Sequence, residues 1–469
     1  MSKLNSRQTK LAYGIGIILL LGPIVYLGFP SSQNAGRDRS GGLGILSQMR
    51  RDYDLGEATL GKVDPSSAAM NLVLLGLRGP AASVLHLKAI EYQERKQWAK
   101  LRATVDSIIL LQPHYVQIWK FQGWNLAYNV SREWDKVDDR FYWVKEGIKF
   151  LILGTERNQS VPILFNDVGE FVSSKMGISD EKKFFREFFE KDPDPKFETA
   201  PGVAGPDPIT NPEGKDSYLV AYDWFVKGNE KDDNDGAIGV EGKTHVFFRQ
   251  GPARALLSYA QTRAEKGLFD EHIAAFDRAY KEWMDVYGKM DFYGLYNHKY
   301  RLNSTEDELK QLAEENGIPL SEQRRIWAQN LDMTNFRYWR DFANVERDPL
   351  MLDARKSLFL AKKAYNEGRG FDRVAADGSL EVSDAEKHLN DAQKYWAELA
   401  TKYPHMFYDG DYVDQSMLVV QYWLAVHQQN SREVPKEYPL KKLWDANETT
   451  RPDAERTFLI ETRNRSIGR

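Results

Sequence analysis

The chain has 469 residues, which is room for two or three domains or for one elongated array of repeats. It contains 64 basic and 68 acidic residues, and no block of basic residues stands out, which argues against a nucleic-acid partner. It contains no cysteine, so disulfides, thiolate catalysis and cysteine-ligated metal centres are excluded.

An uncharged apolar stretch near the N-terminus, Leu11–Phe29, has 19 residues, about the length of helix that crosses ~30 Å of hydrocarbon. Basic residues lie just before it within residues 1–10, and the next one is Arg37. By the positive-inside rule we expect a cytoplasmic N-terminus, a single-pass anchor at 11–29 in the inner membrane, a tether at 30–65, and a periplasmic remainder. A cleaved signal peptide is the alternative, but no clean cleavage site follows the apolar stretch.

A period of 34 residues follows the tether. Leu85 and Trp119 are 34 residues apart, and so are Ala89 and Gly123, and Tyr92 and Leu126. This is the period of the tetratricopeptide repeat, in which each unit is a pair of antiparallel helices. In this register Pro113 ends one unit, Trp119 is a large packing residue of the next, and Gly123 allows close helix approach. The pattern predicts an all-α, TPR-like helical-hairpin solenoid.

The same register returns downstream in three further places. A weak unit covers residues 165–193, a clear one has its tight turn at Gly267, and the last pairs Ala354–Gly368 with a helix that contains Trp396. The matching residues are Phe165, Gly169, Phe185 and Pro193; Leu256, Ala260, Phe269, Phe276 and Ala279; and Ala392, Leu399 and Pro404.

Two segments interrupt the pattern. Asp192–Gly214 contains six prolines and predicts a non-helical linker or strap, and Asn229–Gly242 predicts an acidic loop. We therefore expect repeats at 66–193, an insertion at 194–250, repeats at 251–428 and a polar C-terminal tail at 429–469.

The chain resembles the tetratricopeptide-repeat proteins over about half of its length beyond the anchor. More narrowly, "MNLVLLGLRG", "LQPHYVQIWKFQGWNLAYNVSREWD" and "FYWVKEGIKFL" resemble a family of membrane-anchored, repeat-bearing planctomycete proteins that often carry an "iron-responsive element" label. The resemblance covers most of residues 40–290. It implies a repeat fold and an envelope location but no activity. The residues do not support an iron site, because cysteines and clustered histidines are absent from the sequence.

Two short motifs are weak candidates for chemistry. Ala237–Thr244, "AIGVEGKT", fits a relaxed phosphate-loop pattern, but a solvated loop precedes it, and the following "HVFFRQGP" predicts an extended segment that stops at Pro252. Lys231–Gly236 is similar to a calcium loop, but it lacks the acidic residue at the twelfth position. We expect no nucleotide, no metal and no cofactor, and we expect Lys243 to be a surface-loop residue.

Two aromatic stretches are candidates for partner binding. Ser131–Val144 is expected to enlarge the loop between the two helices of the Trp119 unit, and insertions in repeat arrays often form the binding face. Asn335–Phe342 mixes arginine with aromatic residues, and core packing is the alternative interpretation. The candidate contact residues are Trp134, Tyr142, Trp143, Arg337, Trp339 and Arg340.

These features favour a non-enzymatic, membrane-anchored scaffold or adaptor of the bacterial envelope with protein partners. The alternative is an envelope enzyme, or a carbohydrate- or peptide-binding factor, with its site in the central interrupted region.

Overall fold

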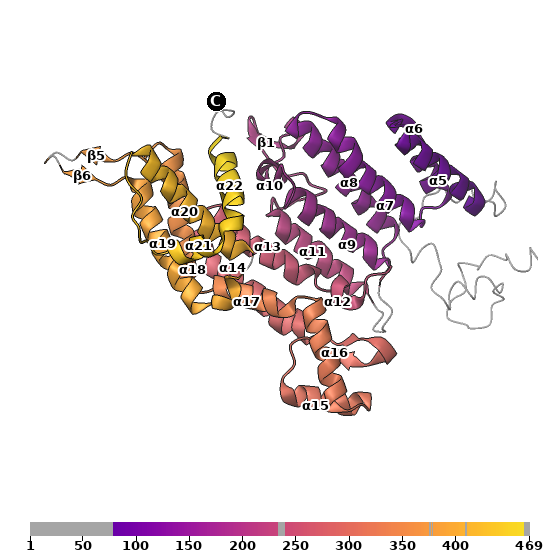
Figure 1. The fold of residues 1–469 in the computed structure, drawn as a ribbon. Helices are drawn as coiled ribbons and strands as arrows, with labels where there is room; N and C mark the ends of the chain where they lie inside the picture. Colours follow the sequence, from indigo (N-terminus) through magenta and orange to yellow (C-terminus); the bar gives the residue numbers. More distant parts are fainter. Residues whose placement is uncertain (1–77, 233–239, 375–376, 378, 409, 464–469) are drawn as a thin grey trace, which may run out of the picture. The chain divides into compact units, whose positions relative to one another are not determined.

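The computed structural model describes residues 78–232, 240–374, 377, 379–408 and 410–463. Most of these residues are helical, which confirms the predicted all-α class (Figure 1). In the described part of the chain, no helix combines the length and the apolar character needed to cross a bilayer. The predicted anchor at 11–29 and the tether at 30–65 lie outside the described residues. Internal contacts divide the chain into two units, Met1–Asp167 and Val168–Arg469, each of which is treated by itself.

The described part of the first unit consists of helical hairpins. Helices α5 and α6 pack on each other, and so do α7 and α8 (Figure 1). A π-helical turn (Asn125–Asn129) and a 3-10 turn (Val130–Glu133) continue α7 toward α8. The helices are α5 (Arg78–Glu94), α6 (Trp98–Leu111), α7 (Val116–Trp124), α8 (Val137–Arg157) and α9 (Pro162–Phe171), of which α9 contains the boundary between the units.

Small residues allow α7 and α8 to approach closely. A Cβ atom built on Gly123 would lie 2.7 Å from Leu151, and one on Gly147 would lie 2.7 Å from the carbonyl oxygen of Gly123. Trp119 is fully buried, and its indole packs against Gly154. The predicted roles of Trp119 and Gly123 as packing residues of a helix pair are confirmed at this contact.

The second unit begins with helices that surround the proline-rich strap. The π-helical turn Val172–Met176 precedes α10, and α11 packs on α13. The strap itself contains a 3-10 turn (Pro195–Phe197) and the antiparallel strands β1 and β2, in agreement with the prediction that it is not an α-helix. The elements are α10 (Lys182–Glu190), β1 (Glu198–Ala200), β2 (Val203–Ala204), α11 (Ser217–Glu230), α12 (His245–Phe248), α13 (Gly251–Glu265) and α14 (Phe269–Lys281).

The predicted tight turn between α13 and α14 is present. Gly267 has a φ of +75°, a conformation that side chains rarely adopt, and an added Cβ atom would lie 2.8 Å from Phe359. The two helices pack on each other and bury Leu256, Ala260, Phe276 and Ala279, all of which the repeat register placed in the core.

A smaller group of elements follows α14. The π-helical turn Glu282–Val286 and the 3-10 turn Tyr287–Lys289 lead into a short antiparallel hairpin of β3 and β4 around the 3-10 segment Leu295–Asn297. Helices α15 and α16 then pack on each other at one side of the unit (Figure 1). The elements are β3 (Phe292–Tyr293), β4 (Lys299–Tyr300), α15 (Glu306–Asn316), α16 (Leu320–Met333) and α17 (Phe336–Glu346).

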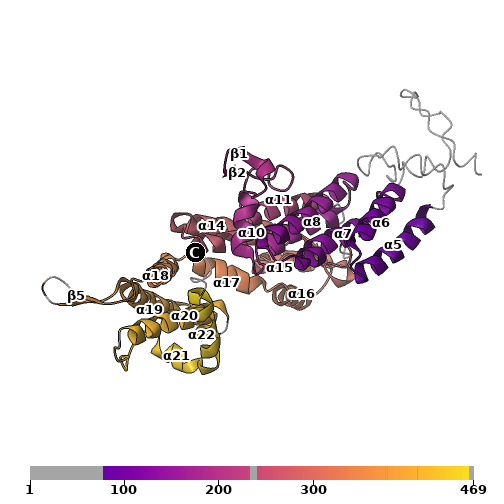
Figure 2. The same ribbon diagram turned by 90° about the horizontal axis from the view of Figure 1, so that it is seen from above.

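The C-terminal part of the second unit is a third helical hairpin with further helices beside it. Helices α18 and α19 pack together, as predicted, and the antiparallel strands β5 and β6 project from the loop between them (Figures 1 and 2). The elements are α18 (Pro349–Asn366), β5 (Arg373–Val374), β6 (Leu380–Glu381), α19 (Asp384–Lys402), the 3-10 turn Pro404–Met406, α20 (Asp411–Gln429), α21 (Lys441–Ala446), the 3-10 turn Glu448–Thr450 and α22 (Arg451–Arg463).

Side-chain caps explain where several helices begin. Thr305 and Glu308 form a reciprocal capping box at the start of α15. Asp348 accepts a hydrogen bond from the backbone amide of Leu350, and Pro349 occupies the first turn of α18, where its missing N–H is not needed. A large apolar core of this unit extends from Val246 on α12 to Phe458 on α22.

Three local expectations differ from the structure. Ser131–Val144 is not an enlarged loop, because only three residues separate the 3-10 turn that ends at Glu133 from the start of α8 at Val137. "HVFFRQGP" is not extended but contains α12 and the start of α13. The segment expected to be a polar tail contains α21 and α22, and α22 packs on α20 through Phe458 and Tyr422 (Figure 2).

Candidate functional site

The three aromatic candidates of the first unit lie close together. Trp134 is 42% exposed and stacks on Trp143 with 6.3 Å between the ring centroids. Tyr142, 40% exposed, meets the edge of Trp143 at 5.4 Å. Trp134 lies in the short connection, whereas Tyr142 and Trp143 lie in the second turn of α8. The three rings therefore form an exposed aromatic surface on a helix start, not on a long loop.

The candidates on α17 are more constrained. Arg337 is exposed and pairs with Asp332 at 2.8 Å, and Arg340 pairs with its neighbour Asp341 at 2.8 Å. Trp339 is half-buried, and Arg254 of α13 lies over its ring at 3.5 Å from the centroid. Core packing is therefore the role of Phe336 and Phe342, which are buried. Arg337, Trp339 and Arg340 reach the surface and remain candidates for partner binding.

A large groove lies in the second unit. Its volume is ≈ 790 Å³, and residues of α10, α13, α18, α20 and α22 line it. Apolar side chains of α13 and α18 contribute Ala264, Leu358 and Phe359 to its wall. This size lies within the range of typical ligand pockets of ~300–1,000 Å³. We call it the α13–α18 groove.

The lining of the α13–α18 groove carries an excess of positive charge. Three acidic side chains, Glu265, Asp411 and Glu461, line it together with five cationic ones, which are Lys182, Lys183, Arg355, Lys362 and Lys363. Glu461 is already bound, because Lys362 donates to it at 2.9 Å and the hydroxyl of Tyr422 donates to it at 2.8 Å. Glu265 is held by Arg186 at 2.7 Å. Two of the three acidic side chains in the lining, Glu265 and Glu461, are therefore already paired. Lys182, Lys183 and Lys363 form no ion pair with any described residue.

One end of the groove rests on a buried ionic cluster. Glu346 is almost completely buried and is held by Arg355 through both carboxylate oxygens, and Nε2 of His272 lies 3.4 Å from the same carboxylate. Burial alone would raise the pKa of Glu346, but Arg355 and His272 outweigh it and lower the pKa to about 2. Glu346 therefore stays ionised and fixes the position of Arg355 in the groove wall.

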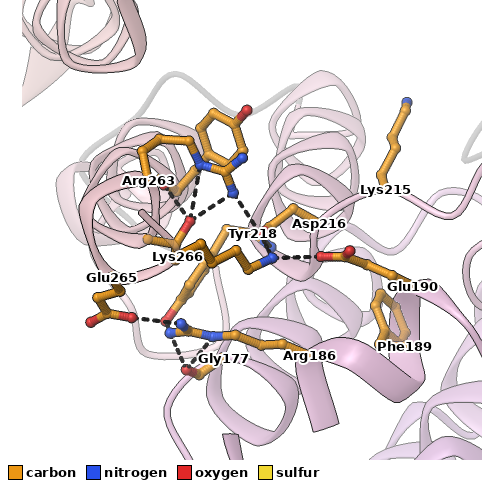
Figure 3. A network of polar contacts seen from close by, with 12 residues as sticks. Gly177, Arg186, Phe189, Glu190, Lys215, Asp216, Tyr218, Arg263, Glu265 and Lys266 are labelled. Atoms are coloured by element: carbon orange, nitrogen blue, oxygen red, sulfur yellow. Dashed lines mark hydrogen bonds and ion pairs between the residues drawn. The ribbon is translucent and has the colours of Figure 1, made fainter. Parts of the chain in front are cut away.

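Arg186 of α10 lies at the centre of a polar network that holds α10 in place (Figure 3). Its Nε and Nη2 donate to the carbonyl oxygen of Gly177 at 3.1 and 2.6 Å, and its Nη1 donates to Glu265 of α13 at 2.7 Å. Its guanidinium also lies over the ring of Tyr218 at 5.2 Å. These contacts tie α10 to α11 and α13, so the lysines at the start of α10 keep their place beside the groove.

A second part of the same network anchors the end of the proline-rich strap (Figure 3). Asp216 caps α11 and accepts a hydrogen bond from Arg263 at 2.9 Å. Lys266 bridges Asp216 at 3.1 Å and Glu190 at 2.7 Å. Asn211 adds side-chain bonds to the carbonyl oxygens of Phe189 and Lys215. The strap is thus attached to the helices at its C-terminal end by buried polar contacts.

The central region holds one further polar cluster. Asp232 lies 3.2 Å from Nδ1 of His245 and 3.1 Å from Nε of Arg249, and all three side chains are largely buried. Lys243 lies in the turn before α12, is partly exposed, and pairs with Glu170 at 3.5 Å, as expected of a surface-loop residue. Among the described residues, no group of three or more His, Asp or Glu side chains is arranged to hold a metal ion.

The α13–α18 groove was not predicted from the sequence. Its residues come from helices that are distant in sequence, such as Lys362 and Glu461. One signal was present, because Arg254, Gln261 and Glu265 are spaced by 7 and 4 residues on α13 and therefore share one helix face. That face is polar, while the opposite face carries the repeat residues Leu256 and Ala260.

A comparison with models of known protein families finds no match, and a comparison with curated protein sequences finds no significant match.

Proposed function

We propose that this protein is a membrane-anchored, tetratricopeptide-like adaptor of the bacterial cell envelope and that its α13–α18 groove binds a peptide segment of a partner protein. The observation that carries the proposal is the groove itself, which combines apolar side chains with unpaired lysines on the surface of a helical-hairpin stack. Grooves between helix pairs are where repeat proteins bind extended or helical peptides.

The repeat assignment is supported by the helical hairpins. The pairs α5–α6, α7–α8, α13–α14 and α18–α19 all occur where the repeat register predicted them. The pairs α7–α8 and α18–α19 bury the large register residues Trp119 and Trp396. The anchor at 11–29 and the periplasmic orientation rest on the charge pattern of the sequence.

The charge of the groove favours an acidic peptide. Lys182 and Lys183 on one wall and Lys363 on the other have no ion-pair partner among the described residues. An acidic peptide would complement them, and its apolar side chains would cover Leu358 and Phe359. The protein would then act by holding one partner at the membrane, a role that needs no catalytic group, nucleotide or cofactor.

The aromatic surface of Trp134, Tyr142 and Trp143 is a further contact in this proposal. Exposed tryptophan and tyrosine residues dominate the binding energy of many interfaces. On α17, Arg337 is exposed and Trp339 and Arg340 are half-buried, and in this proposal they add further contacts.

Blocking the groove tests the proposal. Gln261 is half-buried in the lining, and a Gln261→Trp substitution fills space there without removing a described hydrogen bond. The matched control is Gln428→Trp, an exposed position on α20 outside the lining. We expect both full-length variants to melt like the parent, and only Gln261→Trp to lose partner proteins captured from detergent-solubilised envelopes. Equal capture by both variants would contradict the proposal.

A further inference from the structure

Arg254 of α13 is a cation without an anion. Its guanidinium lies over the indole of Trp339 at 3.5 Å from the ring centroid. None of the described residues forms an ion pair with it, and its Nη1 atom is buried without a hydrogen-bond acceptor. Arg254 as a whole is half-buried, and a buried donor without an acceptor is costly and uncommon in native proteins.

Among the described residues, no carboxylate acts on Arg254 over a longer distance. Burial lowers the pKa of Arg254, and the groups that oppose this shift are the hydroxyls of Tyr338 and Tyr287 rather than any acid. The hydroxyl of Tyr287 is already used, because it donates to the carbonyl oxygen of Val246 at 2.8 Å. Arginine nevertheless remains charged at neutral pH, so this position keeps a full positive charge.

Two other arginines of the same unit that lie over an aromatic ring also pair with a carboxylate. Arg347 also lies over a tyrosine, Tyr280, at 4.4 Å, but it pairs with Asp277. Arg263 lies over Tyr259 at 4.1 Å and donates to Asp216 at 2.9 Å. Each of these combines an aromatic ring with a carboxylate. Arg254 has the ring and lacks the carboxylate.

We propose that Arg254, Trp339 and Tyr338 form a binding site for a carboxylate carried on an apolar group. The indole of Trp339 holds the guanidinium flat, which leaves its N–H edge to donate in the two-pronged geometry that a carboxylate accepts. Tyr338 is 40% exposed, so its ring can cover the apolar part of the ligand.

The charge of the site favours a carboxylate over a phosphate. A carboxylate carries one negative charge, which the single guanidinium of Arg254 neutralises. A phosphate ester carries nearly two, and the neighbouring cations on α17 are already committed, Arg337 to Asp332 and Arg340 to Asp341. The phenol of Tyr338 stays protonated because burial raises its pKa, so it adds no negative charge.

The site does not depend on the groove binding a peptide. Arg254 shares one face of α13 with Gln261 and Glu265, so a carboxylate here could belong to a long ligand of the groove or to a separate small molecule. The site is therefore tested with small probes on the full-length protein, and its outcome is distinguishable from that of the groove-blocking variant.

The first experiment compares three probes by ligand-observed NMR. They are 3-phenylpropionate, its uncharged amide 3-phenylpropanamide, and phenyl phosphate. Since a charged hydrogen-bond pair is worth about tenfold or more in affinity, we expect the carboxylate to bind at least about tenfold more tightly than the amide. Equal binding of acid and amide would overturn the proposal. Tighter binding of phenyl phosphate than of the carboxylate would overturn the assignment of the anion.

The second experiment places the probe. Arg254→Met should abolish binding of 3-phenylpropionate and leave the melting temperature unchanged or higher, because a buried charge without a partner is replaced by an apolar side chain. Arg254→Lys keeps the positive charge but loses the planar guanidinium that donates two parallel hydrogen bonds. This variant should bind 3-phenylpropionate about tenfold more weakly. Arg347→Met is the matched control and should lower the melting temperature while binding persists. Normal binding by Arg254→Met, or by Arg254→Lys if the former does not fold, would contradict the site.

Discussion

Replacing Trp119 by alanine tests whether α7 and α8 are held together as a repeat unit. The side chain is fully buried, packs on Gly154 and lies 5.0 Å from the ring of Phe150. Removal of a buried tryptophan costs about 3–5 kcal/mol. Its Nε1 also donates to the carbonyl oxygen of Pro113 at 2.9 Å, which adds about 1 kcal/mol.

For Trp119→Ala we expect a loss of free energy at the lower end of the range obtained by adding these two contributions. The carbonyl oxygen of Pro113 is not left without a donor, because Nδ2 of Asn158 also reaches it at 3.3 Å. We therefore expect a loss of about 4 kcal/mol in the local stability of this hairpin. The matched control is Trp124→Ala on the same helix, where the side chain is 45% exposed and the expected loss is below about 1 kcal/mol.

Hydrogen exchange measured by mass spectrometry on the full-length protein separates this hairpin from the second unit. A loss of about 4 kcal/mol corresponds to roughly a thousandfold faster exchange of the protected amides in α7 and α8. The amides of α13 and α14 serve as the internal reference. If Trp119→Ala changes exchange in α7 and α8 no more than Trp124→Ala does, Trp119 is not a packing residue of a repeat and the register argument fails.

Three further predictions concern charge and surface. Glu346→Gln should cost about 3–5 kcal/mol at pH 7, because it leaves Arg355 without its buried partner. The pKa of Glu346 is about 2 in the folded protein and near 4.5 in the unfolded chain. The difference in free energy of unfolding between the parent and this variant should therefore shrink as the pH falls from 4.5 toward 2, as measured by denaturant titrations. Parallel pH curves for the two proteins would refute the assignment. Lys243→Ala should leave the melting temperature unchanged and no nucleotide binding should depend on it, which ATP titration of parent and variant checks. Trp134→Ala should keep the melting temperature within about 2 °C of the parent and weaken capture of envelope partners, because the side chain is exposed on its stack with Trp143, and a large drop in melting temperature would show that it is a core residue.

The helix pairs were predictable because their signal is local. Trp119, Gly267 and Trp396 each occupy a fixed place in a helix–turn–helix unit, and the structure places each of them as the register requires. In a repeat, large packing residues and tight turns recur at constant spacing, and this spacing does not depend on the fold of the rest of the chain. The all-α class follows from that spacing.

The expected loop at Ser131–Val144 was wrong because its charges have another role. Asp138 and Asp139 are in the first turn of α8, where acidic side chains stabilise the helix N-terminus. Phe141 and Val144 then fall on the buried face, three residues apart. In the same way, Pro252 lies in the first turn of α13, so it begins a helix rather than stopping an extended segment.

The candidate site could be predicted only in part. Trp339 was found from its aromatic and arginine neighbours, but Arg254, which covers it, is 85 residues earlier in the chain. That no described carboxylate pairs with Arg254 is a property of the packed structure, and no sequence pattern indicates it. The α13–α18 groove is similar, because it depends on which helices of the second unit lie across from each other.

The central claim is that the α13–α18 groove holds a peptide of a partner protein, and site-specific photo-crosslinking in intact cells tests it most directly. A photoreactive amino acid replaces Gln415, which lines the groove, or Gln428, which is exposed on the same helix outside the lining. If a partner peptide lies in the groove, we expect a discrete protein adduct from position 415 of the full-length chain and none from position 428. The adduct should be lost when Gln261→Trp is also present. No adduct from position 415, or the same adducts from both positions, would contradict it.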